Sequence, residues 1–258
     1  MLTNFLVTLA VSALVVGAPS GKQALAKLYT SCTVPNTVAL TFDDGPWIFA
    51  RNVSDALTKA GVKGTFFYNG NNYDCIYNQA RVDDIKYVYA QGHQIGSHTW
   101  SHAHLTQLSK EEVLSEMQRV DQALQRILGV LPAFFRPPYG EYNDDVLTVA
   151  EQVGESAVNW DLDSGDSETK PVDYQKGVYD DAVKRHPSTI LSLEHETYVT
   201  SRDSNEVVEY AISKLQGAGY KLVTVAECLG GLNPYRSTSA PESRTVSWSI
   251  QTLTPLRG

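Results

Sequence analysis

The feature that most constrains this chain is an alternation of short apolar segments with longer helical patterns between residues 38 and 225. The apolar segments predict strands at Thr37–Phe42, Lys63–Tyr68, Gln94–Ser97, Ala133–Arg136, Ser156–Trp160, Ile190–Leu193 and Lys221–Val225. Helical patterns lie between or beside them, at Asn52–Ala60, Val82–Gln91, Asp144–Gln152, Tyr174–Arg185 and Asn205–Gln216. The longest helix is expected to begin at the capping box Ser109–Glu112 and to end at Gly129. This alternation predicts an α/β fold with a parallel sheet.

Two forms of that sheet fit the pattern: a closed or nearly closed barrel, and an open doubly wound sheet. The polar clusters of the chain decide between them, because they all fall just after predicted strand ends. In a (β/α) barrel, the carboxyl ends of the strands meet on one face, where the loops build the active site. The pattern therefore favours the barrel.

The sharpest polar cluster is Thr41–Pro46, where Asp43 and Asp44 leave the end of an apolar strand. Two adjacent anions at such a place repel each other and lose hydration, so a positive group is expected beside them. The alternative is a turn or a helix cap, which aspartate before Gly-Pro often makes.

His98 and His102 follow the third predicted strand at i, i+4 spacing, which puts both imidazoles on one face of a helical turn. Taken alone, one histidine could cap the strand while the other lies on the surface. Asp44 changes the count to two histidines and one carboxylate, a ligand set of open catalytic metal sites. Three protein ligands leave room for water or substrate, as hydrolysis requires.

Further polar residues follow the remaining strands. His195 closes the sixth strand, and its ordinary pKa of about 6.5 suits general acid work. Arg136 could pair with a carboxylate that the metal does not use, and Tyr139 has the first backbone N–H after it because two prolines intervene. The alternative is an ordinary loop with a surface arginine. The acidic stretch Asp161–Asp166 lacks the twelve-residue pattern and terminal glutamate of a calcium loop.

Together these clusters resemble the polysaccharide deacetylases of carbohydrate esterase family 4, and within them the secreted fungal chitin deacetylases. The five sequence blocks of that family occur in order, at Thr41–Pro46, His98–His102, Arg136–Gly140, Asp163–Asp166 and Leu193–His195. Any one block is weak, but five in order at strand-sized spacing are specific. The resemblance implies a distorted (β/α) barrel with parallel strands and an active site at their carboxyl ends. It also implies one divalent metal, with zinc expected and cobalt or another transition metal as alternatives.

The resemblance assigns the metal ligands and the base. Asp44, His98 and His102 would hold the metal. Asp43 would take a proton from the attacking water, and Arg136 would position Asp43. Spacing alone does not say which of the two aspartates does which job.

The same resemblance assigns the remaining catalytic steps. The backbone N–H of Tyr139 would bind the oxyanion, while His195, tuned by Asp166, would protonate the leaving amine. The residues expected to contact substrate are Asp43, Trp100, Tyr139 and Leu193, with Trp160 as a further candidate to stack on a sugar ring. Each of the aromatic residues could equally be core packing.

One position departs from the family pattern. Many members carry an aromatic residue, often tryptophan, after the aspartate of the fourth block, whereas this chain has Ser167. The resemblance therefore does not predict what forms one wall of the acetyl pocket or of the neighbouring sugar subsite in this chain.

These observations predict a hydrolase that removes N-acetyl groups from the N-acetylglucosamine units of chitin or its oligosaccharides and releases acetate. The alternatives with the same machinery are an O-acetyl esterase acting on xylan and a peptidoglycan deacetylase. Two others come from different classes: a non-haem iron oxygenase, since two histidines and a carboxylate also suit Fe(II), and a glycan-binding protein without turnover. A base at Asp43 and an acid at His195 favour hydrolysis.

The two ends of the chain differ from its middle. Phe5–Val16 is an apolar run too short to span a bilayer and is followed by small residues, which predicts a signal peptide over residues 1–20, or up to 26. The alternative is a buried first strand or helix. A catalytic domain is expected over 27–231, followed by a Ser/Thr/Pro-rich, solvated tail over 232–258. The expected protein is a monomer secreted to the extracellular space or the cell wall.

Charge and cysteines fit that location. A net charge of −8 argues against nucleic acid as a partner and leaves chitin or another acetylated polysaccharide, and no membrane span is expected. Cys32 and Cys228 flank the first and last strands, so a bridge would tie the domain ends together and leave Cys75 over. Spacing alone does not choose among the three pairings. Asn52 begins a glycosylation sequon.

Overall fold

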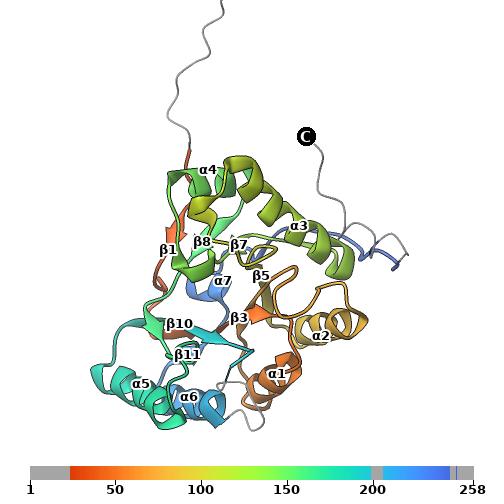
Figure 1. The fold of residues 1–258 in the computed structure, drawn as a ribbon. Helices are drawn as coiled ribbons and strands as arrows, with labels where there is room; N and C mark the ends of the chain where they lie inside the picture. Colours follow the sequence, from red (N-terminus) through yellow and green to blue (C-terminus); the bar gives the residue numbers. More distant parts are fainter. Residues whose placement is uncertain (1–23, 199–205, 245–247, 249–258) are drawn as a thin grey trace, which may run out of the picture.

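The computed structural model describes residues 24–198, 206–244 and 248 of the chain. Helices surround a central group of strands (Figure 1). The strands are β1 Leu28–Tyr29, β2 Thr37–Ala39, β3 Thr41–Gly45, β4 Thr65–Tyr68, β5 Gln94–Ser97, β6 Val130–Pro132, β7 Phe134–Phe135, β8 Ser156–Val158, β9 Leu162–Asp163, β10 Thr189–His195, β11 Lys221–Leu222 and β12 Tyr235–Thr238. The helices are α1 Ala50–Lys59, α2 Gln79–Ala90, α3 Lys110–Leu128, α4 Asp144–Val153, α5 Val172–Arg185, α6 Glu206–Gly217 and α7 Val225–Cys228, with 3₁₀ turns at Leu105–Gln107 and Pro138–Gly140. The predicted signal peptide lies outside the described residues.

The main sheet is parallel and closes on itself, which confirms the predicted distorted barrel. Its strands run in the order β8, β7, β5, β4, β3, β10, and each neighbouring pair is parallel. From β8 the chain passes into β9, which pairs with β10 and so completes the ring. The ring is irregular there, because residues 159–161 interrupt the strand between β8 and β9.

Local signals in the sequence set the helix ends. At the start of α3, the Ser109 hydroxyl accepts from Glu112 N–H while the Glu112 carboxylate accepts from Ser109 N–H, as the capping box predicts. Gly129 ends the same helix in the left-handed conformation, at φ 77°.

The predicted strand Thr37–Phe42 is two strands, because its partner β10 pairs with β2 through Thr189–Leu191 and with β3 through Glu194–His195. Between them the Ser192 hydroxyl takes the place of a backbone partner, accepting from Thr41 N–H and donating to the Ala39 carbonyl. A second difference follows β11, where a capping box at Thr224 begins helix α7.

Most residues of the predicted tail are exposed where the structure describes them, but the first part of the tail is ordered against the domain. Strand β12 pairs antiparallel with β6, and Tyr235 is buried. Arg236 donates to the Pro132 carbonyl and to the carboxylates of Asp121 and Glu155. The segment is therefore part of the catalytic unit, held by partners more than 80 residues away in sequence.

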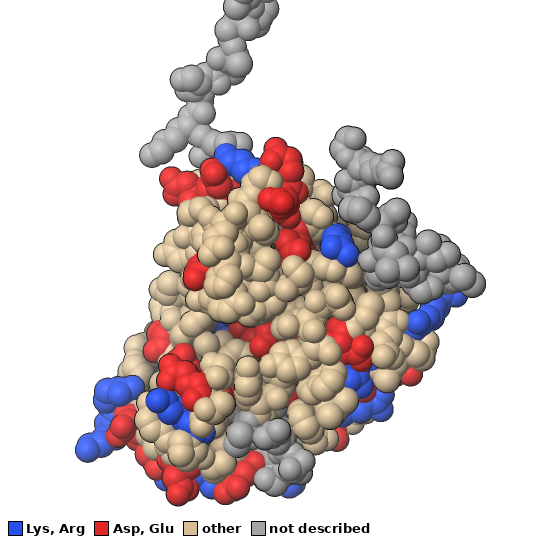
Figure 2. Space-filling view, viewed as in Figure 1, with Lys and Arg blue, Asp and Glu red and all other residues tan. Residues whose placement is uncertain are grey.

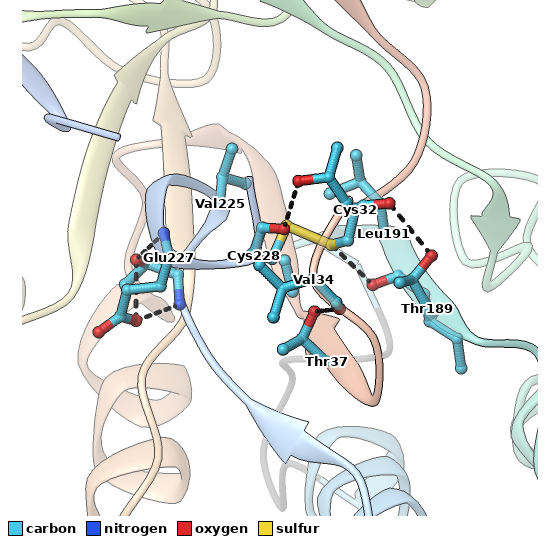
Figure 3. The surroundings of a disulfide bond; sticks show 12 residues. Cys32, Val34, Thr37, Thr189, Leu191, Val225, Glu227 and Cys228 are labelled. Atoms are coloured by element: carbon cyan, nitrogen blue, oxygen red, sulfur yellow. Dashed lines mark hydrogen bonds between the residues drawn. A yellow bond between two sulfur atoms is a disulfide. The ribbon is translucent and has the colours of Figure 1, made fainter. Parts of the chain in front are cut away.

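The predicted disulfide is confirmed: Cys32 and Cys228 form a bridge over a sequence separation of 196. Figure 3 shows it beside the start of β10, where the Thr189 hydroxyl donates to the Cys32 carbonyl. Cys75 is left as a free thiol. The bridge joins the segment before β2 to helix α7, so it links an early and a late part of the chain at the amino-terminal end of β10.

Acidic and basic side chains lie mostly around the margin of the face shown in Figure 2, and the described residues there form no continuous basic surface. Among the described residues, no helix has the length and apolar character needed to cross a bilayer. Asn52 lies in α1 rather than in a loop, half-buried beside the buried Ser54, and its glycosylation stays a prediction.

Candidate active site

The candidate residues gather at the carboxyl ends of neighbouring strands. Asp43 on β3 and His195 on β10 are direct cross-strand partners. His98 follows β5, Arg136 follows β7, and Asp166 follows β9. Because these strands are parallel and adjacent in the barrel, residues up to 152 positions apart in the chain meet on one face.

Asp44, His98 and His102 form a compact donor group. One ligand atom from each lies within 4.8 Å of the other two. The Asp44 Oδ1 is 3.3 Å from His102 Nε2 and 3.7 Å from His98 Nε2. Ligand atoms about 2.1 Å from a tetrahedral metal lie roughly 3.4 Å apart, so this group fits one small divalent ion.

The histidines are held in the form that a metal requires. His98 Nδ1 lies 2.8 Å from the Arg136 carbonyl, which can only accept, so the proton is on Nδ1 and the Nε2 lone pair faces Asp44. Burial lowers the pKa of both His98 and His102 to about 3, and their rings are neutral at physiological pH. Neutral imidazole is the ligand form of histidine.

The segments that present these ligands have left-handed backbone at residues other than glycine. Asp44 has φ 69°, Thr99 φ 68° and His102 φ 56°. Such a conformation costs on the order of 1–3 kcal/mol per residue and persists only where the surroundings enforce it. For Asp44, part of that enforcement is a hydrogen bond from the Asn72 side-chain amide to Oδ1, at 3.1 Å.

Asp43 and Arg136 form a buried ion pair, with Arg136 Nη1 3.0 Å from Asp43 Oδ1. Burial raises the pKa of the Asp43 carboxyl, and the Arg136 charge opposes that rise. A carboxylate with a raised pKa is a better proton acceptor than one in water.

Arg136 also spans the irregular part of the barrel. Its guanidinium donates to the Val158 and Asn159 carbonyls near the end of β8 and to the Ser192 carbonyl on β10. It therefore supplies hydrogen bonds where residues 159–161 interrupt the strand, and a single side chain joins the barrel wall to Asp43.

His195 and Asp166 form a second buried pair. Asp166 Oδ1 accepts from His195 Nδ1 at 2.8 Å, and Oδ2 accepts from the His195 backbone N–H at 2.8 Å. Burial lowers the pKa of His195, but the Asp166 carboxylate and the nearby Asp43 and Asp44 outweigh it and raise that pKa to about 9. This imidazole is therefore protonated at neutral pH, unlike His98 and His102.

A pocket of about 350 Å³ opens over the donor group, lined by Asp44, Asn72, Tyr73, His102, Tyr139 and Tyr198. Tyr139 has φ 59° and a side chain that is 53% exposed. Its ring stacks on His104 with centroids 4.0 Å apart. Sequence reasoning missed Asn72, Tyr73 and Tyr198, which belong to loops without periodicity or a recognisable motif.

The contact of Trp100 with substrate stays a prediction, and the ring is closely packed by neighbouring residues. The ring is 5% exposed, the Arg119 guanidinium lies over it at 3.9 Å, and the Gly70 backbone packs so closely that a Cβ there would come within 2.0 Å of it. Trp100 therefore packs in the core behind the His98–His102 loop. Leu193 is also buried, on β10, while Trp160 is half-buried below Gly140.

This geometry can be compared with known proteins. Residues 30–158 match the family model described as polysaccharide deacetylase. A chitin deacetylase of Pestalotiopsis sp is 37% identical over 219 residues, which cover 81% of this chain and 70% of that protein. A chitin deacetylase of Colletotrichum lindemuthianum is 33% identical over 204 residues, covering 77% and 82%.

The likeness extends to three dimensions. The solved structure of the chitin deacetylase from the fungal pathogen Colletotrichum lindemuthianum superposes with a TM-score of 0.77 at 30% identity. The superposition covers 84% of this chain and 98% of that one.

Proposed function

Because this chain belongs to the polysaccharide deacetylase family, we propose that it removes N-acetyl groups from chitin or chitin oligosaccharides and releases acetate. The observation that carries the proposal is the pairing of Asp43 with His195 on adjacent strands, beside the Asp44–His98–His102 group. A base and an acid close to a metal-ligand group are what amide hydrolysis needs. The two chitin deacetylases compared above support chitin as the substrate.

We assign the metal to Asp44, His98 and His102 and propose zinc, which prefers a few nitrogen and carboxylate ligands with one position left open. When bound, the metal supplies Lewis-acid chemistry: it lowers the pKa of a water and polarises the acetyl carbonyl. Neutral Nε2 donors on both histidines suit that binding, because no proton must leave them first.

The protein's own residues then move the protons. Asp43, held by Arg136, accepts a proton from the attacking water as the C–O bond forms. The backbone N–H of Tyr139 stabilises negative charge on the former carbonyl oxygen. His195, whose Nδ1 is held by Asp166, gives its Nε2 proton to the nitrogen as the C–N bond breaks, so acetate and an amine leave.

The walls of the pocket support a sugar as the substrate. Tyr73 and Tyr139 are 40% and 53% exposed, and Tyr198 lines the pocket with them. Aromatic rings offer apolar faces to the C–H faces of sugars and hydroxyl groups to their polar edges. The net charge of −8 suits a neutral or cationic polymer, and deacetylation makes a neutral one cationic.

We also propose that the protein works outside the cell as a monomer. The Cys32–Cys228 bridge supports this location, since structural disulfides persist in oxidising compartments. The apolar run Phe5–Val16 supports a signal peptide, and Asn52 is then open to glycosylation during secretion.

Acetate release from a panel of substrates tests the function. We expect release from chitin oligosaccharides by the zinc-loaded protein, with acetylated xylan and peptidoglycan as comparison substrates. Release from xylan alone would replace the proposal with an O-acetyl esterase, and release from peptidoglycan alone would move the substrate to bacterial cell walls. No release from any of them would contradict the proposed hydrolysis.

A further inference from the structure

Glu196 is a buried carboxylic acid to which the chemistry above gives no role. It follows His195 at the end of β10 and is 0% exposed. Its Oε1 accepts from the Trp47 backbone N–H at 2.5 Å, and its own backbone N–H donates to the Asp43 carbonyl at 3.3 Å. These two bonds tie one residue to both ends of the segment Asp43–Trp47.

That segment carries both candidate carboxylates, the base Asp43 and the metal ligand Asp44. Its middle lies directly against the Glu196 side chain. A Cβ added at Gly45 would come within 2.3 Å of Glu196 Oε1 and 2.6 Å of the Tyr68 ring, so this close approach requires glycine. On its other side, Gly45 accepts from Asn69 N–H at 2.7 Å. Glu196, Tyr68 and Asn69 therefore enclose the turn.

The turn needs such support because Asp44 has φ 69°. Aspartate enters the left-handed region only at a cost, and without support this residue near the end of β3 would return to a lower-energy conformation. A change at Asp44 would move its carboxylate away from Nε2 of His98 and His102, which are now 3.7 and 3.3 Å from it.

We propose that Glu196 is a positioning residue for the metal site: its side chain holds the Trp47 N–H and thereby fixes the Asp43–Trp47 turn. The feature that matters is a hydrogen-bond acceptor at the full length of a glutamate side chain, in contact with Gly45. Residues that orient metal ligands in this way typically contribute about 10- to 100-fold to metal affinity. The inference rests on the proposed metal site.

The test is the zinc dissociation constant, measured by competition with a chromogenic chelator on metal-stripped protein, alongside the midpoint of urea unfolding. Glu196→Gln keeps an acceptor at full length and should bind zinc as the parent does. Glu196→Asp keeps the carboxylate but withdraws it by one methylene, and Glu196→Ala removes it. Both should weaken zinc binding, and the alanine variant should do so by about 10- to 100-fold.

Glu155→Ala is the matched control. Glu155 is also a buried glutamate, but it lies before β8 at the opposite end of the barrel and contacts Arg236. This variant should unfold at lower urea while its zinc affinity stays at the parental value. A buried carboxyl that served only stability would give the same result at position 196.

The zinc affinities of these variants distinguish a positioning role for Glu196 from a purely structural one. Parental zinc affinity in both Glu196→Ala and Glu196→Asp would overturn the positioning role. Equal losses in Glu196→Gln and Glu196→Ala would overturn it too, because a neutral acceptor of full length would then not suffice. If Glu196→Ala does not fold, the other two variants still test the proposal, because it requires Glu196→Gln to bind zinc more tightly than Glu196→Asp. Absence of zinc binding by the parent would instead overturn the ligand assignment itself, and the role of Glu196 with it.

Discussion

The histidines of the site differ in protonation state because neighbouring carboxylates outweigh the effect of burial at His195 but not at His98 or His102. His98 Nδ1 donates to a backbone carbonyl, and burial leaves its pKa at about 3. His195 Nδ1 donates to the Asp166 carboxylate, which helps to raise the pKa of His195 to about 9 despite burial. His102 follows His98, with a pKa of about 3. The site therefore holds two neutral imidazoles and one protonated imidazole at the same pH, as the proposed ligand and acid roles require.

The assignment of Asp43 as base and Asp44 as ligand predicts different losses for the two. Asp43→Asn should keep zinc and lose about 10²- to 10⁴-fold in kcat, because only the proton acceptor is removed. Asp44→Asn should lose zinc affinity as well as turnover. Zinc content after dialysis and acetate release check both variants, and an Asp43→Asn protein with parental kcat would refute the base.

Asp166 should set the alkaline limit of activity. The acid His195 must be protonated, so activity should fall as pH rises through a His195 pKa near 9. Asp166→Asn removes a carboxylate that raises this pKa, and the alkaline limb should move to lower pH. The measurement is kcat/KM against pH for both proteins; a limb that stays in place would separate Asp166 from the acid.

At the scale of elements, the sequence predicts those whose signals are local. The capping box at Ser109 and the stop at Gly129 bound α3 within a residue, and apolar runs locate the barrel strands. Features that depend on distant partners were missed. The break between β2 and β3 depends on hydrogen bonds of the Ser192 hydroxyl. The ordered start of the tail depends on hydrogen bonds of Arg236. No local pattern distinguishes those side chains from any other serine or arginine.

The same distinction holds within the site. The five motif blocks lie beside strands, and their residues meet because parallel strands end on one face. Asn72, Tyr73 and Tyr198 reach the pocket from loops whose path no periodicity predicts. Trp100 lies between two candidate ligands in sequence, yet it points into the core because the left-handed residues Thr99 and His102 turn the loop around it.

The C-terminal strand should stabilise the fold through Arg236. This side chain donates to Asp121 at 2.6 Å and to the buried Glu155 at 3.2 Å. Arg236→Ala leaves both carboxyl groups without that partner and should lower the free energy of unfolding by about 3 kcal/mol. Urea unfolding checks this, with Lys59→Ala as a control because Lys59 makes only an exposed ion pair. Equal stability of the two variants would show that β12 contributes nothing through this residue.

Over the whole molecule, β10 is the organising strand. It pairs with β2, β3 and β9, so it closes the barrel, and it carries His195 at its end, followed by Glu196. The Cys32–Cys228 bridge lies beside its first residues, far along the strand from the catalytic face. The disulfide therefore lies at one end of β10 and the candidate active site lies at the other.

That separation predicts that the bridge can be removed without loss of the site. Replacing Cys32 and Cys228 together with serine should cost about 2–5 kcal/mol of unfolding free energy and leave zinc affinity unchanged. Cys75→Ser, which touches no bridge, is the control and should match the parent in both. Loss of zinc affinity in the double variant would show that the two ends are coupled.

The central claim is that hydrolysis depends on one metal held by Asp44, His98 and His102. The most direct measurement is acetate release from chitin oligosaccharides during titration of metal-stripped protein with zinc, beside a His102→Ala variant. We expect no release without metal, full activity at one zinc per chain, and no recovery by the variant over the same range. Full activity of the stripped protein, or equal recovery by His102→Ala, would contradict this account of the site.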